Sequence, residues 1–327
     1  MDKKDNLSSA ILIFLCLIAI LAGVLISYAW LEFRSAKWPG VYNAWGQLAD
    51  NADLRAIIRQ FSDAKDQTGI PLLIKILDQP DYEIRYRAID ALVGLKAKQA
   101  GPRLIRLMSE PGNDIRFKAI ESLGLLDDRK SIPALINALK DADPMIRGVA
   151  AVSLGKLQAK AAAPKLISLM DDPHYFVRES AVCALGIIGD KQAIPKLMSI
   201  LTYEDHYLIR RYTVESLGKL NAQEAKSQII ALLQDRDLGV RYKAVISLGK
   251  INAQETIPEM IKLLSHADFN FRKYAAGALA DMNARQAIPD ITKLLKDPDP
   301  SVVAVAVAAL KTLGLTDRAI EKAKEGK

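Results

Sequence analysis

An arginine recurs about every 31 residues along most of the chain, and an acidic residue precedes most of these arginines by six positions. The arginines are Arg85, Arg116, Arg147, Arg178, Arg210, Arg241 and Arg272. The residues six positions earlier are Gln79, Glu110, Asp141, Asp172, Glu204, Asp235 and His266, so five of the seven are acids. Such carboxylates could act as catalytic acids, or they could accept hydrogen bonds from the arginines in a structural ladder. The repetition favours the ladder, because an active site is needed once and a structural device is needed in every repeat.

Two of the three histidines, His174 and His206, occupy equivalent positions in adjacent repeats, and each is followed by a tyrosine. Nitrogen ligands of zinc lie about 2.1 Å from the metal, whereas neighbouring helices pack about 8–10 Å apart. No third ligand recurs nearby, so we expect polar turn residues and no metal site. The chain also has no P-loop, no GxSxG and no CxxC. We therefore expect that it is not an enzyme and that it binds no cofactor.

The elements that position these residues follow from the spacing of proline. Seven of the 14 prolines are separated by 31 residues, except for one step of 63: Pro71, Pro102, Pro133, Pro164, Pro195, Pro258 and Pro289. In the segment 132–155, Pro133 suits a first helical turn, a polar break at 140–143 ends that helix, and a second helix stops at Gly155. Helices this short are marginal alone in water, so we expect about eight pairs over residues 70–314 to bury their apolar stripes against one another.

The starts of the second helices share one pattern. They read IRYRAIDAL, IRFKAIESLG, IRGVAAVSLG, VRESAVCALG, IRRYTVESLG, VRYKAVISLG and FRKYAAGALA. This pattern resembles the HEAT-repeat superfamily, and most closely the short HEAT-like repeats first described in phycobilisome lyases. The resemblance implies an all-α, right-handed α-solenoid, an armadillo-like superhelix in which the arginines and acids would match the Asp/Arg ladder of HEAT proteins. It implies little about activity, because this repeat serves adaptors, lyases, hydroxylases and nucleic-acid enzymes alike.

In HEAT-like stacks the second helices line a concave groove, and the two positions after each arginine would point into it. An aromatic residue and a basic residue stand together there in five of the eight repeats. The ten residues are Tyr86, Arg87, Phe117, Lys118, Arg211, Tyr212, Tyr242, Lys243, Lys273 and Tyr274. Rings supply buried area and cations supply charge complementarity, so this set predicts a groove that binds a protein partner. Alternatively, the rings and long aliphatic stems only cover neighbouring helices.

The N-terminal segment 7–30 predicts a transmembrane helix. It is almost wholly apolar and would span about 36 Å, against a hydrocarbon core of about 30 Å. We expect a signal anchor, because the apolar core of a cleaved signal peptide, the alternative, is usually about 7–15 residues long. Lys3 and Lys4 before the span balance Arg34 and Lys37 after it, and the terminal amine favours a cytoplasmic N-terminus. The sequence therefore predicts a single-pass membrane protein with an exoplasmic or periplasmic solenoid.

The remaining segments complete the predicted organisation. Residues 1–6 would form an N-terminal tail, residues 31–69 a juxtamembrane segment and degenerate capping repeat, and residues 315–327 a charged capping helix. The last second helix, 302–310, lacks the arginine and is apolar all round. We expect the C-terminal cap, a second copy of the chain or a partner to cover it.

Together these features predict a membrane-tethered HEAT-repeat scaffold or adaptor that binds one or more protein partners through its concave groove and performs no catalysis. Three alternatives stay open: a lyase-like or chaperone-like factor for a cofactor-bearing protein, a nucleic-acid-binding HEAT protein, and a purely architectural spacer. The tether and the mixed charge, 45 basic against 38 acidic residues, disfavour nucleic acid. A small-molecule substrate is not expected.

Overall fold

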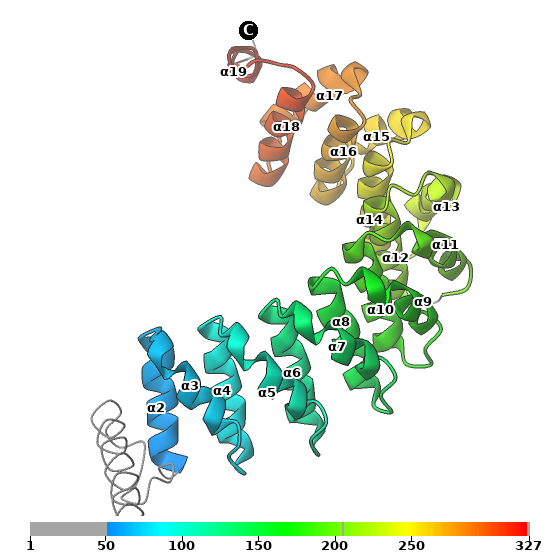
Figure 1. Cartoon of the computed structure of the whole chain (residues 1–327). Helices are drawn as coiled ribbons and strands as arrows, with labels where there is room; N and C mark the ends of the chain where they lie inside the picture. The colour runs from blue at the N-terminus through cyan, green and yellow to red at the C-terminus, as the bar shows by residue number, and fades with distance from the viewer. Residues whose placement is uncertain (1–50, 205, 326–327) are drawn as a thin grey trace, which may run out of the picture. The chain divides into compact units, whose positions relative to one another are not determined.

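The computed structural model describes residues 51–204 and 206–325, and this part of the chain is helical, with no β-strand (Figure 1). The chain divides into two compact units, Met1–Arg103 and Leu104–Lys327. In each unit, pairs of α-helices are joined by short turns, many of them 3₁₀-helical. The described residues therefore form the helical repeat solenoid that the proline and arginine spacing predicted.

Each repeat has a short first helix, the A helix, and a longer second helix, the B helix. The first unit contains α2 (Asn51–Asp63), α3 (Ile70–Ile76), α4 (Tyr82–Gly94) and the start of α5 (Gly101–Leu107). The A helices of the second unit are α7 (Ile132–Ala138), α9 (Ala163–Leu169), α11 (Ile194–Tyr203), α13 (Lys226–Ala231), α15 (Ile257–Leu263) and α17 (Ile288–Lys293). Its B helices are α6 (Asn113–Leu125), α8 (Pro144–Lys156), α10 (Tyr175–Ile188), α12 (Tyr207–Lys219), α14 (Leu238–Lys250), α16 (Phe269–Asp281) and α18 (Pro300–Thr312), and α19 (Asp317–Glu325) follows.

Short 3₁₀ segments complete the repeats. Those that precede A helices are η1 (Gln67–Gly69), η2 (Lys98–Ala100), η3 (Arg129–Ser131), η4 (Lys160–Ala162), η5 (Lys191–Ala193), η6 (Gln223–Ala225), η8 (Gln254–Thr256) and η9 (Arg285–Ala287). Two others, η7 (Leu232–Gln234) and η10 (Leu294–Lys296), extend α13 and α17.

The two helices of a repeat begin for different reasons. Most A helices carry proline in the first turn, for example Pro133 in α7, where the missing N–H has no intrahelical partner to lose. Many B helices begin at an aspartate N-cap: Asp143, for example, accepts a hydrogen bond from the Met145 N–H at 2.7 Å. In the second unit the B helices lie on the inner side of the curve and the A helices on the outer side (Figure 1).

Consecutive B helices of the second unit approach closely because a glycine of one faces a small residue of the next. The facing pairs are Gly124 with Ser153, Gly155 with Ala184, Gly186 with Ser216, Gly218 with Ser247 and Gly249 with Ala278. Serine at this position also donates a hydrogen bond to the preceding helix: the hydroxyl of Ser216 lies 3.0 Å from the carbonyl oxygen of Val182. The recurring Ser-Leu-Gly of the B helices thus sets the spacing of the stack.

The two ends of the described chain have different covers. In the first unit α2, which lies in the predicted capping segment 31–69, packs on α4 and buries Leu54 and Phe61. In the second unit α19 contacts α18 and η10, with Ile320 buried and Lys311 paired to Asp317 at 2.6 Å. The C-terminal helix thus covers part of the apolar helix α18.

The predicted membrane architecture needs correction. No helix within residues 51–204 and 206–325 is long and apolar enough to cross a membrane. The longest of them, α10, has 14 residues and a length of about 21 Å, short of a hydrocarbon core of about 30 Å. The prediction of a single-pass membrane protein with a solenoid on the exoplasmic side is therefore not retained. The segment 7–30, on which that prediction rested, lies outside the described residues.

The close contact between α10 and α12 gives a test of the stack. A Cβ at Gly186 would lie 2.2 Å from the Ser216 hydroxyl oxygen and 3.1 Å from its Cα, so Gly186→Ala must push the two helices apart. We expect a loss of about 1–3 kcal/mol in the free energy of unfolding, seen as a lower midpoint in thermal denaturation. Gly277→Ala is the matched control, because the nearest atom to its Cβ is 4.0 Å away. Equal melting of the two variants would contradict the proposed role of the glycines.

Candidate functional site

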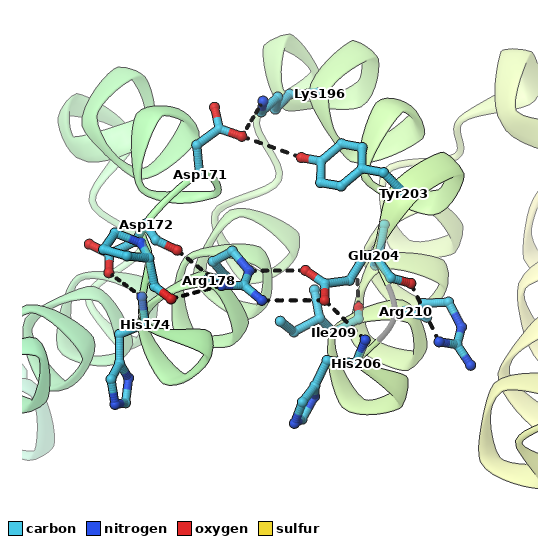
Figure 2. A network of polar contacts seen from close by, with 12 residues as sticks. Asp171, Asp172, His174, Arg178, Lys196, Tyr203, Glu204, His206, Ile209 and Arg210 are labelled. Carbon is cyan, nitrogen blue, oxygen red and sulfur yellow. Dashed lines mark hydrogen bonds and ion pairs between the residues drawn. The ribbon is translucent and has the colours of Figure 1, made fainter.

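Arginine–carboxylate pairs connect the starts of successive B helices in the second unit. The pairs are Arg116–Asp141, Arg147–Asp172, Arg178–Glu204, Arg210–Asp235 and Arg272–Asp297. In the second of these, Nε and Nη2 of Arg147 donate to the two carboxylate oxygens of Asp172 at 2.8 Å each. Figure 2 shows the same two-pronged contact between Arg178 and Glu204, at 2.9 and 3.3 Å. These are bidentate, charge-assisted contacts of the strong kind.

The carboxylate partner of each arginine lies in the following repeat, 25 or 26 residues further along the chain. The spacing had paired each arginine with the acid six residues before it, so this detail of the predicted ladder was wrong. The arginine does reach that earlier residue, but at its backbone: Nη1 of Arg147 donates to the carbonyl oxygen of Asp141 at 2.9 Å. One guanidinium therefore ties its own turn to the turn of the next repeat.

We call each arginine–carboxylate pair a rung of the ladder. The carboxylate of a rung also accepts a hydrogen bond from the backbone. One oxygen of Asp172 accepts the backbone N–H of His174 at 2.9 Å, and Glu204 and Asp235 do the same two residues on. Asp297, which was not among the predicted ladder residues, completes the rung with Arg272 at 2.7 and 2.8 Å. Its signal was present in the sequence, since it stands six residues before Val303, the residue that replaces the arginine in the last repeat.

The series is interrupted after Arg241. The equivalent acceptor position holds His266, whose Nδ1 accepts the N–H of Asp268 at 3.0 Å as a carboxylate oxygen does elsewhere. The Arg241 guanidinium carbon instead lies 5.7 Å from the centroid of the Phe271 ring, and its Nε is buried without a hydrogen-bond partner among the described residues. A cation–π contact therefore replaces an ion pair here.

Four rung carboxylates have lowered pKa values: Asp172, Glu204, Asp235 and Asp297. Burial is the largest influence on Asp172 and raises its pKa, but hydrogen bonds from Arg147 and the His174 N–H, with the charge of Arg147, outweigh it. The pKa values of Glu204 and Asp235 are lowered in the same way. A carboxylate whose folded pKa is lowered stabilises the fold above the ordinary value of about 4, and this contribution is lost as the pH falls through the folded pKa.

The predicted groove residues of the second unit lie on consecutive B helices. We call six of them the aromatic–basic surface: Arg211 and Tyr212 on α12, Tyr242 and Lys243 on α14, and Lys273 and Tyr274 on α16. All six are half-buried. The Tyr242 ring centroid lies 5.6 Å from that of Tyr274, and the Lys273 ammonium lies 4.9 Å from the Tyr274 ring. The structure therefore brings Tyr242, Lys273 and Tyr274 together, and α12, which carries Arg211 and Tyr212, packs on α14 beside them.

Several of these side chains also support neighbouring helices. The Tyr242 ring contacts Phe271 at 4.8 Å, and its hydroxyl donates to Asp268, the N-cap of α16. Lys243 forms an ion pair with Glu215 of α12 at 2.6 Å. Tyr242 and Lys243 thus serve packing as well as surface chemistry, and a double alanine variant there would disturb both.

The other predicted pairs do not join this surface. Phe117 and Lys118 lie half-buried on α6, with Lys118 3.4 Å from Glu121. Tyr86 and Arg87 belong to α4 of the first unit, where Arg87 pairs with Glu83 at 2.6 Å. The ladder residues Gln79 and Arg85 also lie in the first unit and Glu110 in the second.

The two histidines take part in a stack of rings. His174, Tyr175, His206 and Tyr207 follow one another with centroid distances of 5.1, 5.0 and 5.5 Å and nearly parallel planes. Both histidines stand at the N-cap positions of their helices, and their rings point the same way in Figure 2. They are turn residues, as predicted, but they also connect two repeats through Tyr175.

One cysteine lies among the B helices. Cys183 on α10 is half-buried, and burial, followed by the charges of Glu179 and Glu215, raises the pKa of its thiol to about 12. A thiol with this pKa is almost wholly protonated at neutral pH, so it is a poor nucleophile.

The family of HEAT repeats matches this chain over residues 70–151, 132–211, 194–264 and 257–326. The chain belongs to the HEAT-repeat family. The predicted resemblance is thereby confirmed. HEAT repeats generally bind protein partners. No curated protein matches the chain in sequence.

Solved structures of similar fold come from several proteins. YibA of Escherichia coli is 18% identical over 83% of this chain and 100% of that chain, with a TM-score of 0.55. Kap121p is 14% identical over 80% of this chain and 35% of its own, with a TM-score of 0.61. The complex of CpcE and CpcF of phycocyanin lyase from Nostoc is 24% identical over 79% of this chain and 94% of that chain, with a TM-score of 0.40. At these identities the similarity concerns the fold alone.

Removal of one rung should destabilise the solenoid. The Asp172 side chain is only 6% exposed, so Arg147→Ala leaves a buried carboxylate without its ion-pair partner. We expect a loss of about 2 kcal/mol in the free energy of unfolding near pH 7, measured by chemical denaturation. The deficit should shrink at about pH 3, where Asp172 is protonated in more of the molecules. Arg285→Ala, at an exposed arginine of η9, is the control. A deficit that is the same at both pH values would show that the rung charge is irrelevant.

The thiol of Cys183 provides a second test. In a Cys16→Ser variant, which leaves Cys183 as the sole cysteine, a maleimide should react much more slowly with the folded protein at neutral pH than with the unfolded chain. Burial of Cys183 and the raised pKa of its thiol both slow the reaction of the folded protein. Equal labelling rates with and without denaturant would contradict the placement of Cys183.

Proposed function

We propose that this HEAT-repeat protein is a non-catalytic scaffold that binds an acidic protein partner at the aromatic–basic surface on the inner, B-helix side of its second unit. The observation that carries the proposal is the continuity of this surface: three consecutive B helices each contribute one aromatic residue and one basic residue. Tyrosine and arginine are among the residue types enriched at interface hot spots. Repetition of one chemistry along neighbouring helices suits an extended partner better than a compact substrate.

The charges of this surface favour acidic groups on the partner. Arg211 and Lys273 form no ion pair with any described residue, whereas Lys243 is already paired with Glu215. These two cations leave positive charge that carboxylates of a partner would neutralise. The protein as a whole carries a formal net charge of +7, which acts in the same direction.

Several side chains of the aromatic–basic surface are held in place before a partner binds. Tyr242 and Tyr274 are fixed by contact with each other, and Lys273 is held by Asn270 at 3.1 Å. Side chains that are ordered before binding lose less conformational entropy when a partner arrives. The Arg210–Asp235 rung connects the turns before α12 and α14, and the Arg241–Phe271 cation–π contact connects α14 to α16, so the spacing of the surface is set in advance.

The proposal is tested by site-specific crosslinking in the source cells. A photoreactive phenylalanine analogue at position 274 should capture a partner, whereas the same analogue at position 262, on the outer helix α15, should not. Lys273→Glu should then weaken binding of the purified partner about tenfold or more, a change of about 1.4 kcal/mol. Lys262→Glu is the matched control, since Lys262 is 75% exposed on α15. Equal capture from both positions, or unchanged affinity of Lys273→Glu, would refute inner-face binding.

A further inference from the structure

A cavity of about 690 Å³ lies in the second unit between the C-terminal ends of α5 and α7. Both helices are labelled in Figure 1. Ile105 of α5 and the neighbouring Met108 line one side, Ala134 and Ala138 of α7 line the other, and Ile146 of α8 also contributes. Its volume lies within the range of about 300–1,000 Å³ that is typical of ligand pockets. We call it the α5–α7 pocket. It is separate from the aromatic–basic surface, which lies on α12, α14 and α16.

Two alanines that distinguish this repeat from the others open the pocket. At the position of Ala138 the other seven repeats carry leucine or isoleucine: Ile76, Leu107, Leu169, Ile200, Leu232, Leu263 and Leu294. At the position of Ala134 they carry longer side chains: Leu72, Arg103, Lys165, Lys196, Gln228, Glu259 and Asp290. The two alanines are four residues apart and share one helix face, so both truncations widen the same wall.

The truncation is costly for the fold taken alone. Loss of a leucine side chain at a packed position removes favourable contacts and leaves a cavity behind. Seven repeats avoid this cost, and the repeat that accepts it is the one that lines the α5–α7 pocket. A ligand that fills the pocket would supply the missing contacts.

The charged groups around the pocket define the ligand further. Arg116 is fully engaged, because it donates to Asp141, to the Met108 carbonyl oxygen at 3.1 Å and to Asn113 at 3.2 Å. Lys140 is exposed at the rim and forms no ion pair with any described residue. Glu110, the other acid in the lining beside Asp141, has an interaction partner of its own. The pocket therefore combines apolar and polar walls with one ammonium group, that of Lys140, which forms no ion pair with a described residue.

We propose that the α5–α7 pocket binds a large apolar side chain, leucine or phenylalanine, that a partner protein presents beside an acidic residue. The apolar group takes the volume that leucine fills in the other repeats, and the neighbouring carboxylate pairs with Lys140. The partner class is that of the proposed function, an acidic protein, but the contact is a second one on a different part of the solenoid. Each contact can therefore fail without the other.

The first experiment uses a small probe with the same chemistry, anilinonaphthalene sulfonate, which has an apolar body and an anionic group. Full-length protein should bind it saturably, with a component that Ala138→Leu abolishes. This variant restores the residue of the other repeats, so it should fold at least as stably as the natural chain. Ala231→Leu, which adds the same side chain at an exposed site on α13, should leave binding unchanged. Lys140→Glu should weaken the sulfonate about tenfold while sparing the uncharged phenylnaphthylamine. Identical titrations of the natural chain and Ala138→Leu would overturn the pocket.

The second experiment identifies the partner chemistry. Short random peptides are selected on the full-length protein and then compared on Ala138→Leu and Lys273→Glu. Peptides that Ala138→Leu rejects by about tenfold or more should carry leucine or phenylalanine next to aspartate or glutamate. Basic peptides in this class, or none at all, would overturn the proposal. If the selected peptides are rejected only by Lys273→Glu, the result supports the aromatic–basic surface and counts against the pocket. If they are rejected only by Ala138→Leu, the result supports the pocket and counts against the aromatic–basic surface.

Discussion

Each helix pair of this solenoid depends on its neighbours, because an A helix of six to ten residues buries too little surface to persist alone in water. The structure meets this constraint with three repeated contacts: apolar stripes between helices, a serine or alanine against a glycine of the preceding B helix, and an arginine bound to the carboxylate of the next repeat. The first supplies most of the stabilisation. The other two fix the distance and register at which the stripes meet.

Function is most readily sought where this regularity is broken. Where Arg241 faces His266 instead of an acid, rings of Phe271 and Tyr242 fill the space, and the aromatic–basic surface lies beside them. Where Ala138 replaces leucine, a pocket opens. A repeat protein needs its common residues for stacking, so the residues that differ between repeats are those available to recognise something else.

The same B helices carry the ladder arginines and the residues of the inner face. The rung arginine and the two residues after it stand within one turn of a B helix, so the device that joins the repeats also orders the side chains at the inner face. Tyr242 illustrates the consequence, since it packs on Phe271 while its half-buried ring belongs to the aromatic–basic surface. A packing role of Tyr242 is therefore compatible with the proposed recognition role.

The sequence by itself determined the repeat length, the helix pairs, the HEAT-repeat family and the structural role of the arginines. Each of these follows from residues, above all proline and arginine, that recur about every 31 positions. Tertiary structure decided which acid each arginine binds. Asp141 is only six residues from Arg147 in the sequence and Asp172 is 25 residues away, but the stacking of repeats brings the carboxylate of Asp172 to Arg147. Tertiary structure also decided that Ala134 and Ala138 leave a cavity, because the effect of a small side chain depends on what faces it. Contacts between repeats join residues that are far apart in the sequence, and a local pattern does not contain them.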